Sequence, residues 1–292
     1  MTTHELVASQ GKVRRTSSAG TAIYWTAGVL ATLLFVLPLL WAVLRSFEPS
    51  SRITAAPSWS DFTHLSVSNY HDLFAGQIHL WRYVANSLIV SIGTAILVAV
   101  LSTLAGYGFA KFRFRGSGLI FALIVLTLMV PFQAVLTPLF LELNSVHLTD
   151  SRIGLILFYT TFNLPFGTFV MRNTFTAIPS DLEDSAFIDG CGPLRCLFHV
   201  LRPLVIPGVA TTVLYSFLAA WTEFLGALTF LTKTDLFTLP VALLNIQTGT
   251  YGTLNYGYLI AGSVIAMVPC VILFVGLQRF YIRGLASGAV KG

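Results

Sequence analysis

Six long apolar stretches constrain the fold of this chain more than any other feature of its sequence. They cover residues 21–44, 84–110, 119–141, 153–171, 204–231 and 258–277. The hydrocarbon core of a bilayer needs about 20 apolar residues per helix, and the backbone inside it must satisfy its hydrogen bonds internally. The sequence therefore predicts an all-α, polytopic membrane protein with six transmembrane helices, in contact with the lipid bilayer.

The composition supports a membrane protein and argues against a nucleic-acid partner. Of the 292 residues, 55% are hydrophobic and 10% are charged, whereas a soluble domain carries about 25% charged residues. Most of the basic residues lie between apolar runs, a pattern that favours membrane orientation over nucleic-acid binding, which requires a basic face with exposed aromatic rings. Prolines inside the spans predict kinked helices. These are Pro38, Pro131, Pro138, Pro165 and Pro269.

The distribution of Lys and Arg predicts the orientation of the chain. One side of the predicted bundle holds Lys12, Arg14, Arg15, Lys111, Arg113, Arg115, Arg172, Arg195, Arg202, Arg279, Arg283 and Lys291. The other side holds Arg45, Arg52, Arg82, Arg152 and Lys233. Because cytoplasmic loops carry the excess of basic residues, both termini are predicted to be cytoplasmic. We expect a disordered N-terminus over residues 1–20, one membrane domain over 21–283, and a cytoplasmic tail over 284–292.

The polar segment 178–203, between the fourth and fifth spans, contains two helix signals on the predicted cytoplasmic side. Ser180 and Glu183 have the spacing of a capping box, and Gly190 is typical of a left-handed helix stop. A helix from about Asp181 to Asp189 follows from these signals. Helices this short are marginal in water, so we expect packing to hold this one in place.

A second helix signal follows immediately. Gly192 and Pro193 open it, and apolar residues recur along one helical face as far as Leu201. Pro203 is predicted to end this helix, and Pro207 to begin the fifth span. Periodicity alone leaves two interpretations open, which are a docking site for a partner and an amphipathic connection lying on the bilayer surface.

The same segment resembles the cytoplasmic EAA loop of permease subunits in binding-protein-dependent ABC importers. The matching residues are Asp184-Ser185-Ala186, then Gly190, then Pro203 and Pro207, with Asp and Ser where the family pattern has Glu and Ala. The carbohydrate-importing branch is also similar in the flanking motifs 129–133, 164–167, 221–224 and 238–240, and the tail 284–292 resembles that of its maltose-type subunit.

The resemblance implies a short coupling helix that docks in a cleft of an ATP-hydrolysing subunit. The coupling residues would be Glu183, Asp184, Ser185, Ala186, Asp189, Gly190, Pro203 and Pro207. Glu183 and Asp184 are expected to meet basic groups of the cleft, and Ala186 and Gly190 to allow close approach. Gly288 and Lys291 would contact the ATPase through an extended tail. The implied partners are a second, homologous permease chain in a heterodimer, two ATPase subunits and an extracytoplasmic solute-binding protein.

The chain lacks the G-x-x-x-x-G-K-[ST] phosphate loop. ATP and Mg are therefore assigned to the partner ATPase. The sequence predicts no cofactor, no catalytic residue and no metal site in this chain, which is not expected to be an enzyme.

Glu223 is the one carboxylate placed deep within a predicted span. An ionisable residue in a membrane helix is a functional hypothesis, and with Trp221 and Thr222 it is a candidate for the solute pathway. The alternative is that Glu223 pairs with a neighbouring subunit or lies near the outer boundary of the membrane.

The predicted function is that of a plasma-membrane subunit of an ABC importer for a sugar or sugar-like solute. Two alternatives remain open at this point. One is import of glycerol phosphate or related diesters by the same class of protein. The other is an ion-coupled secondary transporter, which favours paired intramembrane charges or broken repeats.

Overall fold

A computed structural model describes residues 18–50, 52–53, 65–76, 78–250 and 254–289, and these residues form helices and connections without a strand. The α-helices are α1 (Ser18–Ser46), α2 (Ser68–Ala75), α3 (Leu80–Lys111), α4 (Ser117–Leu126), α5 (Phe132–Ser145), α6 (Arg152–Thr176), α7 (Asp181–Ile188), α8 (Pro193–Cys196), α9 (Arg202–Thr222), α10 (Leu225–Phe230), α11 (Leu239–Gln247) and α12 (Tyr256–Ala289). Short 3₁₀ turns cover η2 (Thr127–Met129) and η4 (Thr234–Leu236), and a π-helical turn covers η3 (Leu197–Leu201).

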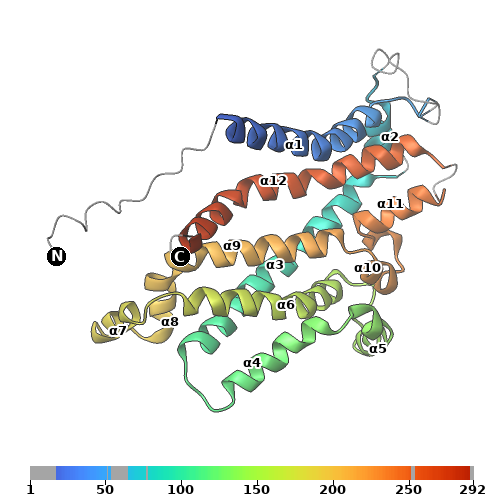
Figure 1. The fold of residues 1–292 in the computed structure, drawn as a ribbon. Helices are drawn as coiled ribbons and strands as arrows, with labels where there is room; N and C mark the ends of the chain where they lie inside the picture. The colour runs from blue at the N-terminus through green and yellow to red at the C-terminus, as the bar shows by residue number, and fades with distance from the viewer. Residues whose placement is uncertain (1–17, 51, 54–64, 77, 251–253, 290–292) are drawn as a thin grey trace.

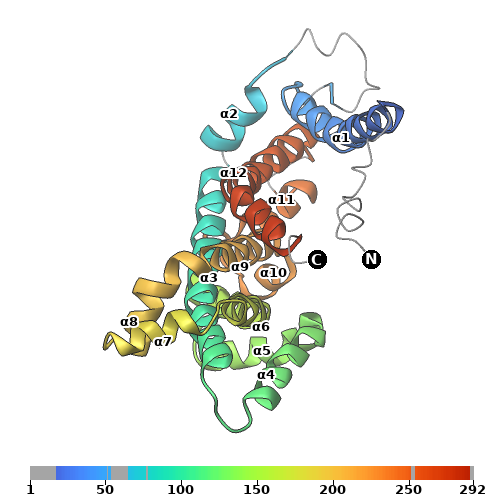
Figure 2. The ribbon, with the colours of Figure 1, turned by 60° about the vertical axis from the view of Figure 1, so that its left-hand side comes forward.

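Three long helices, α3, α6 and α9, pack against one another at the centre of the bundle (Figures 1 and 2). Small residues bring them close. A Cβ atom added to Gly106 of α3 would lie 2.6 Å from Met171 Cβ of α6, and one added to Gly167 of α6 would lie 3.0 Å from Ser102 of α3 and Thr212 of α9. Close backbone approach at small residues is typical of helix packing in membranes. The α12 helix packs on α9, and α1 packs on α12.

Six spans were predicted, and the described residues contain six candidates if the bent third one is counted as a single span. Five described helices are individually long and apolar enough to cross a membrane, and the sixth candidate is the pair Ser117–Met129 and Phe132–Ser145, bent by 101°. The kink predicted at Pro131 is confirmed, and it is sharp enough to divide the segment 119–141 into two helices. Pro131 has no N–H and disfavours helical dihedrals in the residue before it, and Val130 is accordingly extended with ψ 115°.

The fifth span also begins and ends elsewhere than predicted. The short helix that begins at Pro193 was expected to stop at Pro203, before the fifth span. Instead α8, η3 and α9 run without interruption from Pro193 to Thr222. The π-helical turn η3 directly precedes α9, so Pro203 lies within the first turn of that helix, where its missing N–H costs little. At the other end α9 stops at Thr222, and α10 is a separate short helix.

Different short helices lie at the two ends of the bundle. Figure 1 shows α7 and α8 at one end, towards which the first residues of α1 and the last residues of α12 also point. The opposite end, called the far end below, gathers α2, α5, α10 and α11 (Figure 1). The long helix α3 connects the two ends.

Candidate functional site

Residues 178–196, which contain α7 and α8, form a compact projection that we call the knob. The predicted short helix is confirmed as Asp181–Ile188. Gly190 has φ 77°, the left-handed conformation predicted for it, and its N–H donates to the carbonyl of Phe187 at 3.0 Å. The N–H of Cys191 donates to the carbonyl of Ala186 at 2.9 Å, which closes the C-terminal end of the helix.

The predicted capping box does not form. Ser180 has helical dihedrals (φ −64°, ψ −27°), and its side chain makes no capping hydrogen bond. An N-cap residue needs extended dihedrals to place its oxygen over the first amides. Glu183 turns inwards instead and is 5% exposed. Its Oε2 atom lies 2.7 Å from Nζ of Lys111, at the end of α3.

The inward face of α7 therefore packs against other residues of this chain. Ala186 packs against Tyr107, Cys196 and Leu197 in a buried cluster at the base of the knob. Glu183 was expected to meet a partner's basic groups, and Ala186 to allow a partner to approach. The structure instead places both residues on the buried face of α7, in contact with this chain, because their spacing puts them on one side of the helix.

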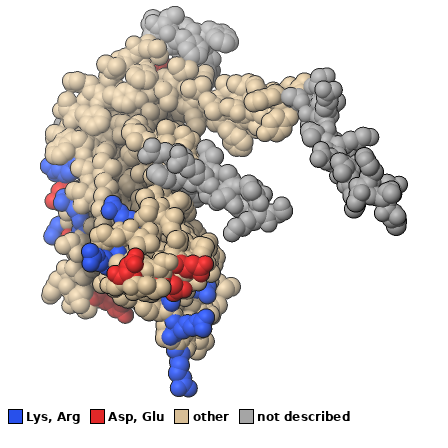
Figure 3. Space-filling model, turned by 90° about the vertical axis from the view of Figure 1, so that its left-hand side faces the viewer, with Lys and Arg blue, Asp and Glu red and all other residues tan. Residues whose placement is uncertain are grey.

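The outward face of α7 combines acidic and apolar side chains. Its exposed residues are Asp181, Leu182, Asp184, Ser185, Phe187, Ile188, Asp189 and Gly190. Figure 3 shows acidic and basic side chains gathered at this end of the molecule. Exposed apolar side chains flanked by charges are typical of a protein-binding surface. Pro203 and Pro207, which were grouped with these residues, lie instead within the first turns of α9.

Lys111 of α3 binds the knob, and the sequence did not predict this role. Its position at the end of a predicted span identified it only as an orientation signal. The sequence offered one further indication that Glu183 has a basic partner, because a buried acid in a short amphipathic helix requires a cation from another element. Nothing in the local pattern shows which cation this is.

A second candidate site is a cavity of about 370 Å³ at the break between α4 and α5. Its polar lining residues are Thr127, Gln133, Tyr159, Asn163, Tyr215 and Glu223. Tyr159 and Asn163 are buried on α6, and the amide of Asn163 donates to the carbonyl of Tyr159 at 2.7 Å. Phe132, Phe158 and Phe162 form an aromatic wall beside them.

Glu223 does not lie inside a continuous span as predicted. It follows α9 and caps α10, because its carboxylate accepts from the N–H groups of Gly226 at 2.9 Å and Ala227 at 3.2 Å. Its Oε2 atom also accepts from the Tyr159 hydroxyl at 2.5 Å. The partners of Glu223 in the described residues thus belong to its own chain, on α6 and α10.

The three predicted pathway residues do not form one site. Trp221 is buried, donates from Nε1 to the carbonyl of Ala266 in α12 at 2.9 Å, and stacks on Phe217. Thr222 is exposed, and its hydroxyl donates to the carbonyl of Leu218. Only Glu223 lines the cavity at the helix break.

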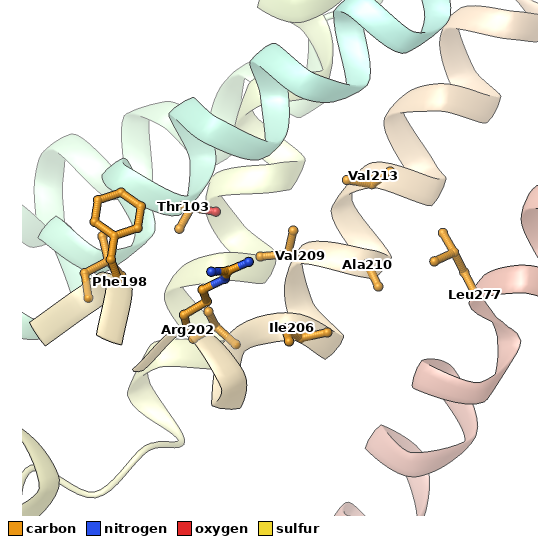
Figure 4. A pocket seen from close by; sticks show the side chains of 10 residues that line it. Thr103, Phe198, Arg202, Ile206, Val209, Ala210, Val213 and Leu277 are labelled. Carbon is orange, nitrogen blue, oxygen red and sulfur yellow. The ribbon is translucent and has the colours of Figure 1, made fainter. Parts of the chain in front are cut away.

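A larger cavity of about 630 Å³ lies between the knob end of α9 and α12. Figure 4 shows Ile206, Ala210 and Val213 of α9 on one side and Leu277 of α12 on the other. Thr103 and Arg202 are its polar residues. A solute rich in hydroxyl groups needs several convergent hydrogen-bonding partners, so this apolar cavity suits it poorly.

The predicted tail contact is partly outside the described residues. Helix α12 continues to Ala289, so Gly288 lies in a helix where an extended chain was expected. Lys291 lies outside the described residues. Among the described residues, no three His, Cys, Asp or Glu side chains come together as a candidate metal site.

The fold and the knob define a transport protein of a known class. Residues 99–287 match the family model of the binding-protein-dependent transport system inner membrane component. The chain belongs to this family. It is the permease subunit of an ABC importer and a multi-pass membrane protein, and such subunits are not themselves enzymes. This assignment does not favour the ion-coupled alternative.

Relatives along almost the whole chain support the assignment. The chain is 34% identical to the arabinooligosaccharides transport system permease protein AraQ of Bacillus subtilis (strain 168), over 90% of this chain and 93% of that protein. It is 33% identical to the trehalose transport system permease protein SugB of Mycobacterium tuberculosis (strain CDC 1551 / Oshkosh), over 93% and 98%.

The fold also matches a solved structure. A chain from a bacterial ABC transporter involved in the import of the acidic polysaccharide alginate superimposes with a TM-score of 0.76 at 20% identity, covering 91% of this chain and 98% of that chain. This likeness concerns the fold alone.

Proposed function

We propose that this subunit forms, with a second homologous permease chain, the translocation pathway for a sugar or sugar-like solute. Two copies of a separate ATPase supply the energy from ATP and Mg, and an extracytoplasmic solute-binding protein delivers the solute. The relatives support the solute class, since their names refer to arabinooligosaccharides, diacetylchitobiose and trehalose. A second structure of the alginate transporter, in complex with a periplasmic protein that binds an alginate pentasaccharide, supports the delivery partner.

The outward face of α7 is the observation that carries the coupling part of this proposal. Asp184 and Asp189 are exposed there beside Leu182, Phe187 and Ile188, and Ile188 is 87% exposed. A helix of eight residues has little stability alone, but here its inner face is fixed to the bundle. The outer face is therefore a rigid surface, suited to docking with its apolar side chains in an ATPase cleft and its acids beside basic groups.

The cavity at the helix break is the proposed place of solute contact. Gln133 and Tyr215 are exposed and offer hydrogen bonds, and the Phe162 ring offers an apolar face. The Oε1 atom of Glu223 accepts only from the Gly226 N–H among the described residues, so it remains open to a hydroxyl donor. No Lys or Arg is among the described lining residues, which favours a neutral solute over a glycerol phosphate or diester.

The orientation and domain boundaries remain part of the proposal. The excess of Lys and Arg supports placing the knob and both termini in the cytoplasm. The far end then faces the binding protein. Residues 21–283 would form the membrane domain, with residues 284–292 as a tail reaching the ATPase through Gly288 and Lys291.

Substitution of Gly190 by Leu tests the proposal. Gly190 has open space around it, but its φ of 77° strains any other residue, so the turn beneath the docking face should distort. We expect at least a tenfold loss of uptake of labelled trehalose and arabinotriose, and loss of co-purification with the ATPase.

Gly118→Leu is the matched control, because Gly118 in α4 also has open space and no positive φ. Normal uptake and normal assembly of the Gly190→Leu variant would contradict the docking role of the knob.

A further inference from the structure

The knob is attached to the bundle by side-chain contacts as well as by the backbone that connects it to its neighbouring helices. Covalently it joins only α6, which precedes it, and α9, which follows it. The structure adds a third attachment, to the end of α3. The Lys111 Nζ atom lies 2.7 Å from Glu183 Oε2 and donates to the carbonyl of Ile178 at 2.9 Å. The Tyr107 hydroxyl, one turn earlier on α3, donates to the carbonyl of Pro193 at 3.3 Å. Three contacts from one turn of α3 thus reach both ends of the knob.

The ion pair in this attachment is shielded from solvent. The side chains of Lys111 and Glu183 are 12% and 7% exposed, respectively. Their surroundings include Tyr107, Ala186 and Cys196, which are all buried. A buried ion pair contributes little net stability compared with apolar side chains of similar size, but it fixes one arrangement of its two elements because separating the charges is costly. The pair is therefore better suited to holding α7 in register with α3 than to stabilising the fold.

At the far end of the bundle, α3 forms hydrogen bonds with the backbone of residues 235–239. The Asn86 amide donates to the carbonyls of Asp235 at 2.8 Å and Phe237 at 2.9 Å. The Ser87 hydroxyl accepts from the N–H of Leu239 at 2.7 Å, where α11 begins. At 1.5 Å per residue the 32 residues of α3 span about 48 Å. A single rigid helix thus connects the knob to the segment that leads into α11.

We propose that Lys111 and Glu183 are a positioning pair that makes α3 move with the knob. A force on α7 would then displace α3, α6 and α9 together, and α3 would carry the displacement to residues 234–239 at the far end. The inference rests on the proposed docking of the knob to an ATPase. It goes beyond that docking because it assigns the transmission to a helix with no covalent link to the knob.

A distance measurement in the assembled importer tests the proposal without knowledge of the solute. Spin labels are placed at Leu104 of α3 and Arg195 of α8, both exposed, after replacement of Cys191, Cys196 and Cys270. In the parent we expect the same distance between the labels in the nucleotide-free and the vanadate-trapped state. In Lys111→Met and in Glu183→Gln the distance should change on trapping, because α8 moves and α3 lags behind.

The transport readout uses labelled trehalose and arabinotriose. Both variants should still assemble with the ATPase and hydrolyse ATP, while solute imported per ATP falls at least fivefold. The exchanged pair Lys111→Glu with Glu183→Lys should recover at least half of the parental ratio and the constant distance. Arg113→Met and Glu142→Gln are the controls, because these residues are exposed and lie outside the pair, and neither should change the ratio.

The outcomes separate this inference from the proposed function. If the parent chain does not assemble with an ATPase, the proposed function fails. If the parent assembles but Lys111→Met keeps both the constant distance and the parental ratio, only the positioning role is overturned. Failure of the exchanged pair to recover either readout would also overturn it, as would a loss of uptake that matches a loss of assembled ATPase.

Discussion

Glu183 and Glu223 are both acids for which contacts outside this chain were considered, and both are bound within it. Glu183 pairs with a cation at the end of α3. Glu223 pairs with a neutral hydroxyl on α6 and with backbone N–H groups of α10. The first therefore depends on a matching charge, whereas the second depends on hydrogen-bond donors arranged by a helix end. An ion pair fixes the knob, whereas hydrogen bonds to a neutral hydroxyl and to backbone N–H groups fix Glu223 in the cavity wall. Substitutions that remove the charge should therefore destabilise the knob more than the cavity wall.

Glu183→Ala should give the largest loss of stability. It leaves Lys111 without its counter-charge in a shielded position, and breaking a buried ion pair costs about 3 kcal/mol or more. Thermal unfolding of the purified chain in detergent measures the effect. The double variant Glu183→Ala with Lys111→Met should recover part of the loss, and an equal or greater loss in the double variant would show that charge is not what holds the knob.

Glu223→Ala should cost about 2 kcal/mol, because it removes a helix cap and leaves the buried Tyr159 hydroxyl without its acceptor. Glu223→Gln should cost less than half as much, since the amide oxygen still accepts. The same thermal unfolding assay measures both. If Gln were as harmful as Ala, charge and not geometry would hold this site, and the contrast with Glu183 would fail.

Glu223→Gln also tests the solute pathway. If the carboxylate binds a solute hydroxyl, the concentration of trehalose or arabinotriose at half-maximal uptake should rise severalfold while assembly stays normal. Unchanged affinity and rate would remove Glu223 from the pathway and leave it a capping residue.

Tyr159→Phe should have a smaller effect, of about 1 kcal/mol, because it removes one hydrogen bond and retains the α10 cap. A double-mutant cycle with Glu223→Ala, which removes the acceptor, measures the coupling between the two side chains. Additive losses would contradict a direct contact.

Asp150 at the far end should show the smallest effect, and only at low pH. Burial raises the pKa of its carboxyl, but hydrogen bonds from Thr232 and Lys233 outweigh burial and hold the pKa below 3.8. A lowered pKa in the folded state contributes stability above pH 3.8 that is lost as the pH falls through the folded pKa. The stability difference between the parent and Asp150→Asn should therefore be constant from pH 5 to 7 and shrink below pH 3.8.

Local chemistry made several features of the knob predictable. Gly190 was identified as a left-handed stop because only glycine adopts that conformation without strain, and the limits of α7 followed within one residue. The capping box failed because the side-chain pattern does not specify the dihedrals of Ser180. The break at Pro131 was visible as a proline, but whether such a proline kinks a span or folds it back by 101° depends on the neighbouring helices.

The sequence by itself determined the membrane class, the candidate spans and the position of the short helix α7, because these follow from apolar length, turn chemistry and a short motif. Only the tertiary structure decided which acids face inwards and what they bind. Lys111 lies far from Glu183 in the sequence, and Tyr159 far from Glu223, so no local pattern connects either pair. The tertiary fold brings the end of α3 to α7, and α6 to the segment between α9 and α10. Desolvation then requires each carboxylate to have its partner.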